Sequence, residues 1–153
     1  MTVTGFPALL AFALQAAAMG VDEFYFHRKR RLPRWERLGH PLDTLSVLAC
    51  YGVTLVSAPT PGALTTYVAL AIFSCLFVTK DEFVHAKHCE PREHWLHSLL
   101  FMLHPIVLAS AAWLWVQTGF RALLITQTAL TLAFGSYQLL YWNLPWTQRS
   151  PDR

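Results

Sequence analysis

Five apolar stretches, separated by short polar segments, constrain this chain more than any other feature. They cover about residues 5–21, 42–58, 62–79, 98–117 and 120–142. The last three approach the roughly 20 residues that a helix needs to cross a bilayer core, and the first two, at about 17 residues, suffice if their helices continue into the interface. The pattern therefore predicts an all-α fold, a polytopic membrane helical bundle of about five spans.

Composition supports this prediction. Only 14% of the 153 residues are Asp, Glu, Lys or Arg, whereas soluble domains carry roughly 25%. A small soluble domain has a large surface to cover with polar groups, so the deficit argues against a water-soluble globule. The length fits one compact unit, and we treat residues 1–153 as a single membrane domain. Three widely spaced cysteines do not suggest a disulfide-stapled secreted fold.

The basic residues predict the orientation in the membrane. Eleven of the twelve Lys and Arg residues fall on one side of a five-span topology, and Arg121 alone falls on the other. The positive-inside rule then puts the two long charged connections and the C-terminus in the cytoplasm, and the N-terminus outside. We expect a multi-pass protein of the cell (inner) membrane. No positive charge precedes residue 21, which favours a first span over a cleaved signal peptide.

The positions of the Lys and Arg residues also indicate which binding partners to expect. They lie in loops between apolar segments and form no separate basic face, so we expect no nucleic-acid partner. We interpret most of them as a solvated cytoplasmic rim that snorkels toward membrane lipids. This rim comprises Arg28, Lys29, Arg30, Arg31, Lys80, Lys87 and Arg92.

The chain contains an internal repeat. The run Asp22-Glu23-Phe24 recurs as Asp81-Glu82-Phe83, and each copy continues with a His, then Pro-Arg, then a Glu with a second His four residues later. The first copy spans about residues 5–58 and the second about 62–117, while the extra span, 120–142, has no counterpart. Each copy is a two-span unit, so both are expected to present similar half-sites on the same membrane face.

Histidines and carboxylates gather at the cytoplasmic connections. All seven histidines and eight of the nine acids lie in these connections or within about two turns of them. Residues three or four apart share a helix face, so four helices each offer a carboxylate and an imidazole. Carboxylates and imidazoles from four helices are the ligands typical of a dinuclear metal site in a helix bundle. The expected ligands are Glu23, His27, Glu36, His40, Glu82, His85, Glu93 and His97. Further ligands, or groups that orient a ligand, are Asp43, His88, His94 and His104.

Mixed oxygen and nitrogen ligands suit iron, manganese or zinc. We expect two metal ions, with iron preferred and zinc or manganese as alternatives. Cys89, a lone loop cysteine, is left out of the predicted site.

The spacing resembles two groups of di-iron proteins. Glu82-x-x-His85 resembles the Glu-x-x-His pattern of ferritin-like di-iron carboxylate proteins. The pairs His85-x-x-His88 and His94-x-x-His97 resemble the clustered histidines of membrane-bound di-iron hydroxylases and desaturases. The resemblance covers residues 22–43 and 81–104. It implies oxygen-dependent hydroxylation or desaturation of a lipophilic small molecule that enters from the bilayer, with electrons from an external donor.

Other chemistries remain open. A zinc-dependent membrane hydrolase would use metal-bound water at the same groups. A non-enzymatic metal carrier, or a haem protein with paired histidines as axial ligands, would also need them. The sequence contains no GxGxxG or GxxxxGK[ST] phosphate loop and no GxSxG nucleophile elbow.

Overall fold

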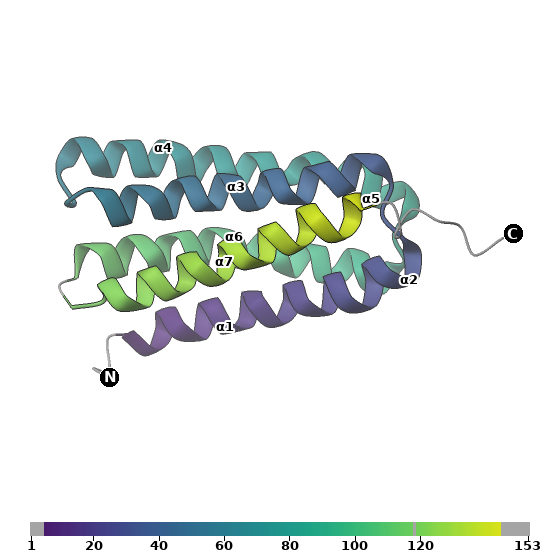
Figure 1. The fold of residues 1–153 in the computed structure, drawn as a ribbon, viewed down its shortest axis with the longest axis horizontal. Helices are drawn as coiled ribbons and strands as arrows, with labels where there is room; N and C mark the ends of the chain where they lie inside the picture. The colour runs from purple at the N-terminus through teal and green to yellow at the C-terminus, as the bar shows by residue number, and fades with distance from the viewer. Residues whose placement is uncertain (1–4, 118, 145–153) are drawn as a thin grey trace, which may run out of the picture.

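The computed structural model describes residues 5–117 and 119–144, without the side chains of Val84 and His88. All regular structure in this part of the chain is helical, as predicted, and Figure 1 shows its course. The elements are α1 (Phe6–Val21), η2 (Asp22–His27), α2 (Arg28–Arg30), α3 (Arg34–Val56), α4 (Pro61–Phe77), η3 (Val78–Asp81), α5 (Glu82–His88), α6 (Pro91–Val116) and α7 (Arg121–Asn143). The C-terminal tail with Arg149 and Arg153 lies outside the described residues.

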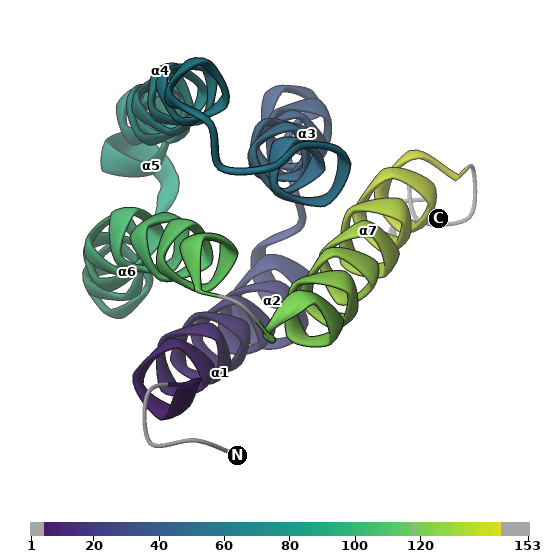
Figure 2. The ribbon, with the colours of Figure 1, turned by 90° about the vertical axis from the view of Figure 1, so that its left-hand side faces the viewer.

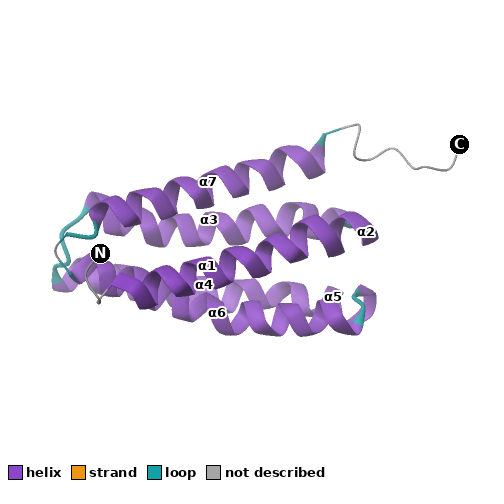
Figure 3. Cartoon of the chain, turned by 90° about the horizontal axis from the view of Figure 1, so that it is seen from below, coloured by secondary structure: helices purple, strands orange, loops and turns teal. Residues whose placement is uncertain are grey.

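These elements form five long rods. The first, Phe6–Arg30, joins α1, η2 and α2 without a break, and α4, η3 and α5 join in the same way. Short connections at alternate ends make successive rods antiparallel, as Figure 3 shows. The connections at 31–33 and 89–90 both lie at the end that α2 and α5 reach in Figure 1. The two copies of the repeat therefore turn at the same end of the bundle.

Prolines mark where several helices begin. Pro61 and Pro91 occupy the first turns of α4 and α6, where a missing backbone N–H costs nothing. The hydroxyl of Thr60 caps α4 by accepting a hydrogen bond from the Ala63 backbone N–H. At the opposite end, Arg31 adopts a φ of 62°, which ends α2 and turns the chain toward α3.

Four of the helical segments are long and apolar enough to cross a membrane: Phe6–Arg30, Pro61–Lys87, Pro91–Val116 and Arg121–Asn143. The fifth rod, α3, has 23 residues, about 35 Å of helix, and its first half is more polar. Large apolar side chains such as Val68, Ile72 and Leu76 are exposed on the outside of the bundle. An apolar exterior of this extent is consistent with a multi-pass membrane protein.

The structure corrects one expectation. The charged segments between the apolar stretches are not loops, because most of their residues continue the helices. Residues 22–30 and 80–88 extend the first and third rods, and 34–41 and 91–97 begin the second and fourth. The polar side chains near the turns are therefore mounted on rigid helical backbone.

Figure 2 shows the rods end-on, arranged around a common centre. Helix α3 packs against α4 and α7, while α6 packs against α1 and α4. Close to the end opposite the charged turns, this packing encloses an apolar core that includes Phe12, Cys50, Ala111 and Leu114. The hydroxyl of Tyr67 donates a hydrogen bond of 2.7 Å to the Leu108 carbonyl and ties α4 to α6.

Candidate metal centre

A π-helical turn shapes the first part of the site. In η2 the backbone is wound more widely than in an α-helix, a feature that often marks functional sites. As a result, both Asp22 and Glu23 reach His27. Nδ1 of His27 lies 3.3 Å from Glu23 Oε2, and its Nε2 lies 3.1 Å from Asp22 Oδ2. All three side chains are buried.

Four imidazoles from four helical segments meet at this end of the bundle. His27 and His40 come from the first repeat copy, with ring centroids 4.8 Å apart, and His85 and His97 come from the second, 4.0 Å apart. Between copies, His27 lies 6.3 Å from His97, and His40 lies 6.4 Å from His85. The two cross distances are nearly equal, as a pseudo-two-fold relation between the copies requires.

These imidazoles have nitrogens without hydrogen-bond partners. Within the described part of the chain, five buried ring nitrogens accept or donate no hydrogen bond: His27 Nε2, His40 Nε2, His85 Nδ1, His85 Nε2 and His97 Nδ1. The His27 nitrogen is close to Asp22 but is not aligned for a hydrogen bond. Buried polar atoms are nearly always satisfied, so such a concentration in one place indicates a missing ligand.

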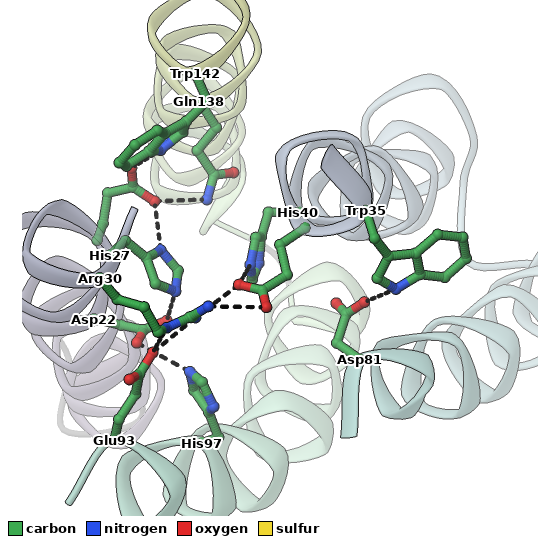
Figure 4. A network of polar contacts seen from close by, with 12 residues as sticks. Asp22, His27, Arg30, Trp35, His40, Asp81, Glu93, His97, Gln138 and Trp142 are labelled. Atoms are coloured by element: carbon green, nitrogen blue, oxygen red, sulfur yellow. Dashed lines mark hydrogen bonds and ion pairs between the residues drawn. The ribbon is translucent and has the colours of Figure 1, made fainter. Parts of the chain in front are cut away.

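Carboxylates surround the imidazoles. Asp22 Oδ1 is hydrogen-bonded to His97 Nε2 at 3.0 Å and so connects the two repeat copies. Glu36 and Glu93, the equivalent acids of the two copies, are 0% and 1% exposed. Arg30 lies between them and donates to Glu36 at 2.7 and 3.1 Å and to Glu93 at 2.9 and 3.1 Å. Figure 4 shows Arg30 beside Glu93.

This position of Arg30 overturns its interpretation as a residue of the solvated rim. Its side chain is only 16% exposed, and it holds the first turns of α3 and α6 together through two buried carboxylates. The cluster thus contains four buried acids (Asp22, Glu23, Glu36 and Glu93) and one guanidinium, which contacts Glu36 and Glu93. The carboxylates of the cluster outnumber its guanidinium, so the cluster is suited to a bound cation.

The extra span, α7, anchors Glu23. Trp142 Nε1 donates a hydrogen bond to Glu23 Oε1, and Gln138 Nε2 donates to Glu23 Oε2 at 3.3 Å. Gln138 in turn accepts a hydrogen bond of 3.0 Å from Thr44 on α3. With both oxygens engaged in this way, Glu23 orients His27 through Nδ1 and fixes which of its nitrogens faces the cluster.

A second polar group lies beside His40. Lys80 Nζ contacts Asp43 Oδ1 and Oδ2 at 2.6 and 2.7 Å and Asp81 Oδ2 at 2.9 Å. Trp35 Nε1 also donates to Asp81, at 3.0 Å. The side chain of Lys80 is 16% exposed, so Lys80, like Arg30, is a buried counter-ion and not part of the rim.

Among the described residues, candidate ligand atoms form four overlapping groups, each with its atoms within 4.8 Å of one another. The groups are Asp22, His27, Glu93 and His97; His27, Glu36 and His40; His85, Cys89 and His97; and His40, Asp43 and Asp81. His27, His40 and His97 each belong to two groups. Overlap of this kind suits adjacent ions better than a single isolated one.

The ligands expected from the sequence do not all lie together in the structure. It brings seven of them into the buried cluster: Glu23, His27, Glu36, His40, His85, Glu93 and His97. Asp43 lies at its edge, paired with Lys80. The other three described candidates lie elsewhere. Glu82 and His94 pair with each other at 3.2 Å, both 40% exposed, and His104 is hydrogen-bonded to Ser74 Oγ at 2.9 Å. The side chain of His88 is outside the described residues.

Sequence reasoning missed Asp22, Asp81 and Cys89. The repeated Asp-Glu-Phe run contains both aspartates, so the repeat itself was a usable signal for them. Cys89 lies close to His85 and His97 because α5 ends there and the chain turns toward α6. Burial raises the pKa of the Cys89 thiol to about 12, so without a cation beside it this group is a thiol and not a thiolate.

A cavity of about 330 Å³ extends from the cluster into the bundle. One end is lined by polar residues that include Asp22, His40, His85 and His97, and the wall continues along Met19, Val47, Leu100, Phe101, Val107 and Leu130. The volume falls within the range of small-molecule sites. The candidate ligands therefore face a largely apolar chamber.

Comparison with known proteins adds no assignment, because no family profile, curated protein or solved structure matches the chain.

Proposed function

We propose that this chain is a multi-pass protein of the cell (inner) membrane that holds two metal ions, preferably iron, and oxidises a lipophilic molecule. The observation that carries the proposal is the set of five buried imidazole nitrogens without hydrogen-bond partners, surrounded by buried carboxylates. The positive-inside rule supports a cytoplasmic location for the site and an outside N-terminus.

The geometry favours two ions over one. Two imidazoles on one ion, each bound at about 2.1 Å, hold their nitrogens roughly 3 to 4 Å apart. Each repeat copy offers one close pair of rings, His27 with His40 and His85 with His97, and the ring centroids between copies are 6.3 and 6.4 Å apart. One group of ligand atoms, which includes His27 and His97, spans the two copies. Asp22 and Glu93, which lie near His27 and His97, are suited to bridge the two half-sites.

Hydroxylation of a membrane-soluble substrate would explain why the candidate ligands face a largely apolar cavity. The reaction converts a C–H bond and O₂ into C–OH and water, and consumes two electrons and two protons from an external donor. Bound iron would supply the redox chemistry. The apolar wall of the cavity would exclude water and hold a membrane-soluble substrate against the histidines. Desaturation requires the same donor and the same chamber.

The alternatives fit less well. The pairs His27–His97 and His40–His85, with centroids 6.3 and 6.4 Å apart, have the spacing of axial haem ligands, but the other imidazole of each copy lies 4.8 or 4.0 Å from its neighbour and would crowd the macrocycle. A zinc hydrolase remains the main rival, because histidine and carboxylate ligands also bind zinc. The largely apolar chamber favours oxidation of a lipophilic molecule over hydrolysis, which requires water at the centre.

Metal analysis and absorption spectroscopy of the purified full-length protein test the proposal. We expect about two irons per chain and no Soret band, since the ligand set matches a non-haem dinuclear site. A strong Soret band would indicate haem, and a colourless protein with stoichiometric zinc would favour the hydrolase. Absence of transition metal after expression in metal-replete medium would overturn the proposal.

The repeat makes a second prediction. His40→Ala and His97→Ala remove equivalent imidazoles of the two copies. Each ring lies at nearly the same distance from a ring of the other copy, 6.4 Å from His40 to His85 and 6.3 Å from His97 to His27. We expect similar losses of metal from the two variants, measured by elemental analysis under identical chelator challenge. Retention of full metal content by one variant alone would show that the two half-sites are not equivalent.

A further inference from the structure

The cavity ends in a second polar region, away from the histidines. Gln15 on α1, Tyr51 on α3 and Gln127 on α7 all line it. Tyr51 lies seven residues beyond Thr44, and Gln127 lies eleven residues before Gln138, both along their helices. At 1.5 Å per residue, these side chains lie about 10 to 16 Å deeper than the Thr44–Gln138 hydrogen bond.

The deep polar groups are incompletely satisfied by the protein. Within the described residues, Gln15 Oε1 is buried without a hydrogen-bond partner, and its amide nitrogen contacts only the weak acceptor Met19 Sδ, at 3.8 Å. Gln127 Nε2 reaches Thr131 Oγ1 at 3.5 Å, the limit of a hydrogen bond. Tyr51 is 1% exposed, and its side chain interacts with Gln127. Polar groups in this condition within an apolar bundle indicate a binding role.

The cavity lining includes exposed residues of α1 and α7. Ala16 on α1 and Leu130 on α7 line the cavity and are also exposed, Leu130 by 62%. Residues from both helices therefore face the cavity and the exterior at once. This side of the bundle is therefore the candidate entry for a molecule dissolved in the membrane, since it does not involve the charged turns.

We propose that the cavity binds an elongated, uncharged, membrane-soluble molecule whose hydrogen-bonding end contacts Gln15, Tyr51 and Gln127, and whose apolar end lies at the histidine cluster. This inference specifies the substrate class of the proposed oxidation and rests on it in that respect. The molecule enters between α1 and α7. Oxidation then takes place at the end of the chain remote from its polar group.

The distribution of charge along the cavity favours an uncharged polar group at its deep end. Its charged lining residues are all acids near the histidine end: Asp22, Glu23, Asp43 and Asp81. A carboxylate at the deep end would be buried without a cation, which is costly. An alcohol or carbonyl at the deep end, by contrast, would satisfy the free oxygen or the amides of the two glutamines.

Photolabelling with a decanol probe tests the proposal in lipid nanodiscs. The probe carries a diazirine at the end remote from its hydroxyl, and decane and decanoate probes with the same diazirine serve as comparisons. We expect the decanol probe to label residues near the histidines, such as Leu100 and Phe101. In Tyr51→Phe, labelling at low probe concentration should fall about fivefold, as expected for one lost hydrogen bond. Gln127→Leu is the second variant.

Tyr67→Phe is the matched control, because Tyr67 is also buried and hydrogen-bonded but does not line the cavity. It should label as the wild type does. Equal labelling of all three variants, equal labelling by decane or decanoate, or labelling confined to the deep end would overturn the proposal. Metal content is measured on the same samples. Selective decanol labelling without metal would refute the oxidation while supporting the binding site. Bound metal without selective labelling would refute the binding site while leaving the metal centre supported.

Discussion

Arg30→Met is expected to lower the free energy of unfolding by about 3 to 5 kcal/mol, because it leaves two buried carboxylates without their shared counter-charge. Glu36 and Glu93 have side chains 0% and 2% exposed, and Arg30 contacts both. Methionine keeps much of the apolar part of the arginine side chain, so the loss of stability measures mainly the removal of the positive charge. Reversible SDS-induced unfolding in mixed micelles, with a chelator present, measures the effect without metal ligation.

Lys29→Met is the control. Lys29 pairs with Glu90 at 2.8 Å, but both side chains are more than half exposed, so this variant should change stability by less than about 1 kcal/mol. Adding Glu36→Gln and Glu93→Gln to Arg30→Met should recover much of the loss. If Arg30→Met is no less stable than Lys29→Met, Arg30 is not the buried counter-ion of the cluster.

The fold was largely predictable because it depends on apolar segments long enough to span a membrane. The five predicted stretches each became a long helix, and four segments meet the length and apolarity of a membrane span. The first half of α3 is polar because it carries Glu36 and His40 into the cluster. Hydropathy marks where the apolar part of a helix ends, not where the helix ends, so the basic residues of the helical extensions were wrongly placed in loops, although the carboxylate and histidine pairs were placed on helices.

The candidate site was predictable where ligands follow α-helical spacing. Glu23 with His27 meets that condition, and the repeat identified all four clustered histidines. Asp22 is five residues before His27, a separation that shares a face only in the π-helical turn, and α-helical spacing does not find it. Glu82 and His85 do have the right spacing, but Glu82 turns outward to His94.

The two buried cations could not be found from the sequence. Arg30 and Lys80 belong to segments rich in basic residues, and at a membrane interface most such residues are solvated. Which one turns inward depends on tertiary contacts. Arg30 does so because Glu36 and Glu93 begin adjacent helices on either side of it, and Lys80 because Asp43 lies opposite it on α3.

His85→Ala is expected to weaken metal binding strongly. His85 is 3% exposed, both its ring nitrogens lack hydrogen-bond partners within the described chain, and its ring lies 4.0 Å from that of His97. Loss of an outer residue that orients a ligand weakens metal affinity roughly 10- to 100-fold. Loss of His85, a direct ligand in our proposal, should exceed that range. Elemental analysis after dialysis against chelators of increasing strength measures the change.

His94→Ala and Glu82→Ala are the matched controls, since the sequence pattern offers both residues as ligands but the structure pairs them with each other at 40% exposure. Both variants should keep the metal affinity of the wild type, because a half-exposed pair outside the cluster contributes no ligand to it. If His94→Ala loses as much metal as His85→Ala, ligands outside the four-histidine cluster hold the ions. If His85→Ala keeps its metal, the unpartnered nitrogens do not mark the centre.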